Sequence, residues 1–217
     1  MLSLETYRKK SSLKILCLGS HCDDIEIGCG GTLLKLIQSR HGNVAIQWVI
    51  FSSTAEREDE ARRSAQVFLK RSAQKSLVIE HFEDSFFPYN GGEIKKFMQG
   101  LSRESSPDLI FTHYKNDLHQ DHRLIAELTW NAFRDHWILE YEVPKYDGDL
   151  GSPNLFVPLT GTICLKKINN IVHSYKSQRN KNWFTKETFL SLHRLRGVEC
   201  NANSGYAEAF YCRKLVW

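Results

Sequence analysis

The amino-acid sequence predicts an α/β sandwich, in which helices cover both faces of a mostly parallel sheet. Short, mostly apolar runs alternate with segments that repeat apolar residues at helical spacing. Because the runs are apolar on both faces, they are typical of strands covered on both sides, as in a parallel sheet. The βαβ order of the first half then requires right-handed crossovers between parallel strands.

The first half of the chain predicts four strands and three helices between or after them. The strands are expected at Leu13–Leu18, Val44–Phe51, Leu77–Ile79 and Leu109–Thr112. The helices are indicated by apolar stripes at Ala61/Ala65/Phe68/Leu69, at Ile94/Phe97/Met98/Leu101 and at Leu124/Ile125/Leu128/Ala132/Phe133. Met1–Ser20 has basic residues before an apolar run, as a signal peptide does, but the apolar part is short. A buried first strand is therefore the better interpretation.

After about Leu139 the pattern changes, because proline and glycine punctuate shorter elements. Two strands, two helices and a last strand are expected near Leu139–Val143, Leu155–Leu159, Leu165–Ser177, Thr185–Leu195 and Tyr206–Val216. No linker rich in Pro, Gly or Ser separates domains, and no internal repeat is found. The sequence therefore predicts one domain over residues 1–217 with a C-terminal elaboration.

Composition excludes several classes of protein. The 217 residues are 41% hydrophobic and 25% charged, which is ordinary for a soluble globular chain. The net charge is +4 without a strong cluster of Lys and Arg, so no nucleic-acid partner is expected. No apolar run approaches the roughly 18 residues of a membrane-spanning helix, so no membrane insertion is expected. None of the six cysteines forms a CxxC pair, and reduced thiols in a cytoplasmic protein are the simplest expectation.

Two polar clusters follow predicted strands. Residues 20–32 follow the first strand, and residues 113–122 follow the fourth. In an open α/β sheet, ligands bind beyond the carboxyl ends of the strands, and the first and fourth strands are usually neighbours. The two clusters are therefore expected to converge on one crevice.

The residue types in these clusters are those of a hydrolytic metal site. Catalytic zinc commonly takes three ligands from His and Asp or Glu, which His21, Asp24 and His122 would supply. Asp23 is adjacent to Asp24 and could take a proton from water, and His119 could stabilise an oxyanion. Taken singly, each cluster is better explained by helix capping and dipole effects than by a metal site, and Asp121 could be such a cap. Together, the two clusters favour the metal site.

The glycine run Gly28–Gly31 is not a nucleotide-binding fingerprint. GxGxxG would need glycine where Leu33 stands, and the GK[ST] ending of a P-loop is absent. The run is instead expected to let a helix begin close to the sheet.

Five short motifs resemble the PIG-L/LmbE-like family of zinc-dependent N-acetylglucosaminyl deacetylases. They are the HPDD…GCGGT-like segment His21–Thr32, the RxxEA-like segment Arg57–Ala61, the DxHxDH-like segment Asp117–His122, the YxSQ-like segment Tyr175–Gln178, and Arg196-Gly197 with Tyr206–Phe210. The resemblance implies a Rossmann-like, three-layer fold and hydrolysis of an N-acetyl group on an amino sugar or related glycoside.

The resemblance also implies roles for single residues. His21, Asp24 and His122 would bind zinc. Asp23 would be the general base and would later give the proton to the leaving amine. Protonated His119 would support the oxyanion or act as acid, Asp121 would hold a histidine in its working tautomer, and Arg57 would bind the sugar or its substituent. Another divalent ion remains compatible, because ligand types overlap between metals.

Three positions depart from the family pattern. Cys22 replaces the usual Pro and places a thiol beside the metal, although three other ligands are already present. Ile25 replaces a frequent Glu, with Glu26 next to it. Asp117 stands where some members have a Tyr that assists the oxyanion.

Other residues carry weaker expectations. His113 could line the crevice or be structural, and Glu208 could contact the site or be a charge on the surface of a strand. Trp183 and Phe184 are candidates for contact with a substrate or partner. Core positions are expected for Trp48, Trp130, Phe133 and Trp137.

The resulting hypothesis is a zinc-dependent deacetylase of a small N-acetylated sugar or sugar conjugate. Two alternatives remain open, namely a non-catalytic sugar- or nucleotide-binding module on the same sheet, and an amidase acting on a larger conjugate. Specificity is expected from the loops Ser53–Glu58, Ser85–Gly92 and Glu142–Asn154.

Overall fold

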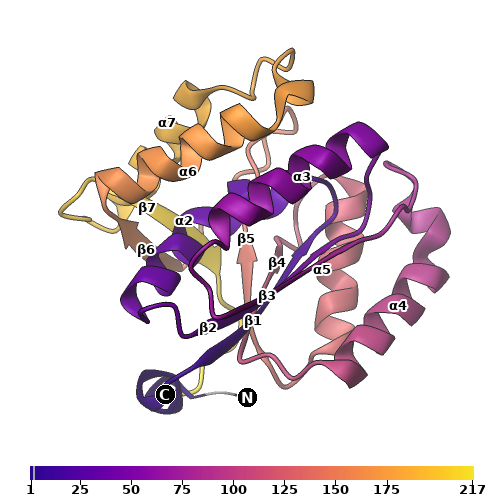
Figure 1. Ribbon diagram of the computed structural model, residues 1–217, viewed down its shortest axis with the longest axis horizontal. Helices are drawn as coiled ribbons and strands as arrows, with labels where there is room; N and C mark the ends of the chain where they lie inside the picture. The colour runs from indigo at the N-terminus through magenta and orange to yellow at the C-terminus, as the bar shows by residue number, and fades with distance from the viewer. Residues whose placement is uncertain (2) are drawn as a thin grey trace.

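The computed structural model of the chain describes Met1 and residues 3–217. A seven-stranded sheet in the order β3-β2-β1-β4-β5-β7-β6 forms its middle layer (Figure 1). The first five strands pair in parallel, and β7 runs antiparallel to β5 and β6. The strands are β1 (Leu13–Gly19), β2 (Val44–Ile50), β3 (Gln74–Ile79), β4 (Leu109–His113), β5 (Trp137–Tyr141), β6 (Leu155–Leu159) and β7 (Tyr206–Tyr211). The predicted α/β fold with a C-terminal elaboration is confirmed.

Helices cover both faces of this sheet. Figure 1 shows α4 (Gly91–Glu104) and α5 (Gln120–Ala132) on one side. The other side carries α2 (Asp24–Ser39), α3 (Ala55–Phe68), α6 (Gly161–Ser174) and α7 (Lys186–Glu199). Two 3-10 turns, η1 (Phe87–Asn90) and η2 (Lys176–Gln178), precede α4 and follow α6. The sheet thus separates two apolar cores, one on each face.

The cores contain most of the aromatic residues that the sequence assigned to them. Trp48, Phe133 and Trp137 are buried, whereas Trp130 is only partly buried. The glycine run has the expected effect on α2. A Cβ atom on Gly28 would lie 2.1 Å from the ring of Tyr141, so only glycine lets the helix approach the sheet at this point.

Several predicted boundaries were wrong. Strand β3 begins three residues early because polar Gln74–Ser76 still pair with β2 at the sheet edge. The last strand stops at Tyr211, because the segment after it leaves the sheet. Strand β5 and helix α6 lie a few residues earlier than expected, and α7 continues to Glu199. The helix α1 (Leu4–Lys9) was not predicted, because it is short and buries no residue of its own.

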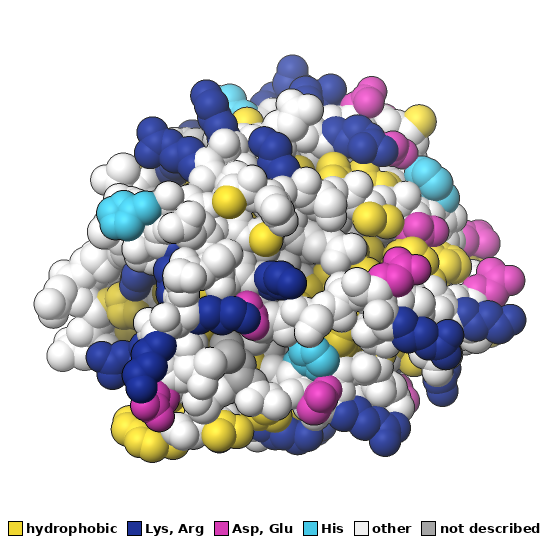
Figure 2. Space-filling view, turned by 60° about the horizontal axis from the view of Figure 1, so that its bottom comes forward, with side chains coloured by type: hydrophobic (Ala, Val, Ile, Leu, Met, Phe, Trp, Pro, Cys, Tyr) yellow, Lys and Arg dark blue, Asp and Glu magenta, His cyan; other side chains and the backbone are white. Residues whose placement is uncertain are grey.

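The surface agrees with the mild charge of the sequence. On the face drawn in Figure 2, basic side chains are interspersed with acidic ones rather than gathered in one stripe. No helix in the described part of the chain has the length and apolarity to cross a membrane. The six cysteines are free thiols in the described structure.

Candidate functional site

The two polar clusters converge at the carboxyl edge of the sheet. Strand β1 pairs directly with β4, which brings the segments that follow these strands together. A cavity of about 290 Å³ opens at this place. Its walls include His21, Asp23, Asp24, His119 and His122, from both segments. The expectation of a single crevice is confirmed.

Three donor atoms form a small triangle in this cavity. His21 Nδ1 lies 3.3 Å from His122 Nε2 and 3.5 Å from Asp24 Oδ2, and the last two atoms are 3.6 Å apart. Zinc bonds of about 2.0–2.1 Å to a tetrahedral set place neighbouring donors about 3.4 Å apart. All three side chains are buried. The triangle therefore fits zinc or a divalent ion of similar size.

Each histidine of the triangle has a carboxylate at its other ring nitrogen. Asp121 Oδ2 lies 3.1 Å from His21 Nε2, and Asp117 Oδ2 lies 2.9 Å from His122 Nδ1. A carboxylate at the far nitrogen fixes the tautomer and the ring orientation of a metal-binding histidine. Both rings are thus held with one nitrogen turned toward the triangle.

Asp117 connects three parts of the site. Its Oδ1 accepts hydrogen bonds from the backbone of His119 at 2.8 Å and from Lys145 Nζ at 2.9 Å. Burial opposes ionisation of Asp117, but the hydrogen bond from His122 and the charges of His122, His113 and Lys145 together outweigh it and hold the pKa below its usual range. Sequence reasoning treated Asp117 only as a departure from a family pattern. The available signal was an acid five residues before a candidate histidine ligand.

Asp23 is held in an unusual conformation with one oxygen free. Its φ of 98° lies in the left-handed region, which favours glycine. Arg57 Nη2 donates to Asp23 Oδ1 at 3.1 Å and also donates to the backbone carbonyl of Cys22. Oδ2 is buried and finds no hydrogen-bond partner among the described residues. Burial raises the pKa of the Asp23 carboxyl to about 7.

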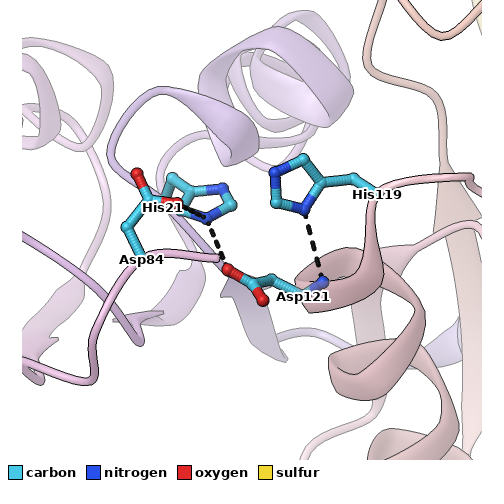
Figure 3. Close-up of side chains that lie close together, drawn as sticks. All are labelled: His21, Asp84, His119 and Asp121. Carbon is cyan, nitrogen blue, oxygen red and sulfur yellow. Dashed lines mark hydrogen bonds and ion pairs between the residues drawn. The ribbon is translucent and has the colours of Figure 1, made fainter. Parts of the chain in front are cut away.

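His119 caps the N-terminus of α5, and its Nδ1 accepts the backbone N–H of Asp121 at 3.3 Å. This bond leaves the ring proton on Nε2. Figure 3 shows the imidazole facing His21, with 4.9 Å between the two ring centroids. Burial lowers the pKa of His119, so the ring is neutral near pH 7. The sequence analysis expected a protonated ring, whereas this geometry provides a donor in the neutral one.

Asp84 is a contact that sequence reasoning missed. It lies in the loop after β3, and its Oδ1 is 3.2 Å from His21 Nε2. The side chain is 58% exposed and lines the cavity. A single acid in a loop carries no motif, so the sequence held no signal for it.

Two residues near the triangle lie outside the cavity wall. His113 is buried and stacks on His122 with 3.8 Å between ring centroids, and its Nε2 accepts the backbone N–H of Ser20. The thiol of Cys22 lies 3.2 Å from Ser53 Oγ. Burial raises the pKa of this thiol to about 12, which keeps it protonated.

Three other expectations are resolved by burial. Trp183 lines the cavity, but Phe184 is buried in the core and cannot contact a substrate. Glu208 is neither at the cavity nor on the surface, since it is buried and pairs with Lys167 at 2.6 Å. Glu26 is also buried and accepts the hydroxyl of Tyr175 at 2.6 Å.

Parts of the three loops expected to give specificity lie at the site. Arg57 lies in the first turn of α3, since the segment expected as the first loop is helical from Ala55, and it lines the cavity. Val143, Lys145, Tyr146 and Asp147 of the third loop also line it. The second loop approaches through Ser85, whose backbone N–H donates to Asp121.

The chain is similar to known proteins in both sequence and fold. A family model described as PIG-L, GlcNAc-PI de-N-acetylase, matches residues 16–133, which is more than half of the chain. An uncharacterized deacetylase of Escherichia coli, YaiS, is 25% identical over 137 residues, covering 60% of this chain and 74% of that protein.

Solved structures show the same fold. The N,N'-diacetylchitobiose deacetylase of Pyrococcus horikoshii superposes with a TM-score of 0.74 at 20% identity, covering 93% of this chain and 84% of that one. GalB, the 4-carboxy-2-hydroxymuconate hydratase of Pseudomonas putida, gives a TM-score of 0.72 at 16% identity, covering 93% and 96%. A deacetylase and a hydratase share this architecture, so the reaction has to be argued from the site.

Proposed function

The chain belongs to the PIG-L family of GlcNAc-PI de-N-acetylases, and on that premise we propose that it is a zinc-dependent deacetylase of an amino sugar or related glycoside. The observation that carries the proposal is the triangle of His21, Asp24 and His122, beside the free Oδ2 of Asp23. Metal-assisted amide hydrolysis needs donor atoms that can hold an ion and a carboxylate oxygen that is free to take a proton. This cavity contains both.

His21, Asp24 and His122 would hold the ion. The chemistry that zinc supplies in such sites is a lowered pKa of bound water and polarisation of a carbonyl. Asp117 and Asp121 would keep the two imidazoles turned toward the ion, as their hydrogen bonds to the far ring nitrogens indicate.

Asp23 is the proposed general base. Arg57 occupies Oδ1, so Oδ2 is the atom that would take the proton from the attacking water and later give it to the leaving amine. His119 would donate its Nε2–H to the oxygen that becomes negatively charged. Trp183 and Tyr146 line the same cavity and are the proposed contacts to the sugar ring.

Two substitutions separate the proposed ligands from the proposed base. Asp23→Asn should retain about one zinc per chain and lose activity by at least about 100-fold, because general base catalysis contributes ~10²–10⁴. His122→Ala should lose the metal itself, because it removes one of the three proposed ligands. Zinc content is measured by elemental analysis, and acetate release is measured on a panel of free, nucleotide-linked and lipid-linked N-acetylated sugars.

The outcomes are distinct. Equal loss of zinc in both variants would contradict the separation of base and ligand. Zinc-loaded protein that releases no acid from any substrate would favour a binding module. Release of a larger acid in place of acetate would identify an amidase on a larger conjugate.

A further inference from the structure

Arg196, which is not in the cavity wall, holds both ends of a loop that lines the cavity. This 142–151 loop lies in the connection between β5 and β6 and contains no helix or strand. Arg196, on α7, donates from Nε and Nη2 to the two carboxylate oxygens of Glu142 at one end of the loop. The same Nη2 donates to the backbone carbonyl of Gly151 at the other end, at 3.0 Å. A single guanidinium therefore closes the base of the loop.

The contact between Arg196 and Glu142 is buried and has a fixed geometry. The two side chains are 7% and 5% exposed. Nη1 donates to both carboxylate oxygens of Glu199, each at 2.8 Å, so the five N–H groups of the guanidinium all have partners. A planar guanidinium that binds a carboxylate through two nitrogens fixes direction as well as distance. The position of Glu142 relative to α7 is thereby set.

The middle of the loop reaches the candidate site. Lys145 Nζ lies 2.9 Å from Asp117 Oδ1, and Asp149 Oδ2 accepts the backbone N–H of Leu118 at 2.8 Å. None of the proposed zinc ligands and neither Asp23 nor His119 belongs to this loop. The loop therefore forms part of the wall that a sugar would meet, and the reacting groups stand on other segments. The loop side chains in that wall are Val143, Lys145, Tyr146 and Asp147.

We propose that Arg196 is a positioning residue that sets the affinity for the sugar by holding the 142–151 loop in its binding position. The identity of the ligand rests on the proposed function. An irregular loop that loses the contacts at its base gains conformational freedom, and a ligand must then order the loop when it binds. Because this cost falls on binding, the KM should rise while the zinc ligands and Asp23 remain in place. Arg196 belongs to a segment that resembles the family, and the loop contacts give it a role.

Arg196→Lys tests this role, because lysine keeps the positive charge but lacks the planar fork that reaches both ends of the loop. The KM for N-acetylated sugars should rise by at least about 10-fold, whereas kcat and zinc content should stay within about threefold of wild type. Glu199→Gln is the matched control, because Glu199 also accepts from Arg196 but lies on α7 and not in the loop. The control should change the KM by less than about twofold.

Hydrogen exchange of the backbone amides in residues 143–150, without substrate, measures the loop independently of any reaction. These amides should exchange at least about 10-fold faster in Arg196→Lys than in wild type or in Glu199→Gln. If Arg196→Lys does not fold, the double variant Arg196→Met/Glu142→Gln replaces it, because it leaves no unpaired carboxylate at the buried contact. It should show the same faster exchange and the same raised KM.

The outcomes separate this role from a purely structural one. Unchanged exchange of the loop in a folded variant overturns the proposal, and so does faster exchange with an unchanged KM. A loss of kcat or of zinc with an unchanged KM also overturns it, because Arg196 would then support only the fold. If wild-type protein hydrolyses none of the sugars, the proposed function fails. Calorimetric affinity for the same sugars then decides on Arg196, since equal affinity in wild type and Arg196→Lys overturns the proposal and weaker binding in the variant supports it.

Discussion

Replacing Asp117 by Asn should weaken zinc binding although Asp117 is not a proposed ligand. Two oxygens of Asp117 accept from three donors, namely His122 Nδ1, the backbone N–H of His119, and Lys145 Nζ. An asparagine has the same shape but only one acceptor oxygen. Whichever way the amide is turned, at least one buried donor faces an NH₂ group.

The expected fall in zinc affinity follows from the loss of one acceptor oxygen. If the amide oxygen remains with His119 and Lys145, the NH₂ group meets His122 Nδ1 and drives the ring proton to Nε2, the atom that belongs to the triangle. If it turns the other way, Lys145 and the backbone of His119 lose their acceptor. An unpaired buried donor costs about 1–3 kcal/mol. Zinc affinity should therefore fall about 10- to 100-fold, which is the usual range for partners of metal-binding histidines.

The assay is competition for zinc against a chromophoric chelator, with circular dichroism to verify the fold. Asp149→Asn is the matched control, because Asp149 also accepts from Lys145, at 2.6 Å, but contacts neither His119 nor His122. The control should bind zinc with an affinity within about twofold of wild type. That change is well below the loss expected when a carboxylate that holds a metal-binding histidine is replaced. A folded Asp117→Asn protein with unchanged zinc affinity would refute the argument that Asp117 sets the orientation of His122.

Two further predictions concern stability, measured by chemical denaturation. Gly28→Ala should destabilise the fold by about 1–3 kcal/mol, because its methyl would meet the buried ring of Tyr141. At Gly100 an added methyl would meet no atom within 4 Å beyond its chain neighbours and the nearby backbone of its own helix. Gly100→Ala should therefore stabilise helix α4 by up to about 1 kcal/mol, and equal effects of the two substitutions would contradict this contrast. Lys167→Met should cost about 3–5 kcal/mol, because it leaves the carboxylate of Glu208 buried without its cation. Adding Glu208→Gln should recover part of that loss, and no recovery would refute the ion-pair explanation.

The sequence predicted the elements whose burial is regular. Leu13–Gly19 and Leu109–His113 are buried along their whole length apart from one residue, and apolar runs identified both. Strand β3 at the sheet edge was underestimated, because its first three residues are polar and exposed. Helix α1 was missed for a related reason, since it is held by a backbone bond from Leu4 to Val216 near the other end of the chain. Such elements are defined by tertiary contacts, and the local sequence pattern does not encode those contacts.

The same distinction applies to the site. His21, Asp24 and His122 were identifiable because they stand at the ends of adjacent strands, and the fold brings them together for that reason. Asp84 comes from a loop whose path depends on backbone bonds to Asp121, which no local pattern encodes. Glu208 was misplaced because its partners are backbone N–H groups in α2, far away in sequence.

Cys22 shows how a departure from the family pattern can be compensated. Proline would fix the backbone immediately before Asp23, whose left-handed conformation is strained by about 1–3 kcal/mol for a residue with a side chain. In this chain hydrogen bonds replace that constraint, since Arg57 holds the carbonyl of Cys22 and Ser53 contacts its thiol. Because Arg57 also engages Oδ1 of Asp23, one guanidinium supports the strained backbone and leaves Oδ2 as the free oxygen. Arg57 therefore acts on the proposed base itself, whether or not it also contacts the sugar.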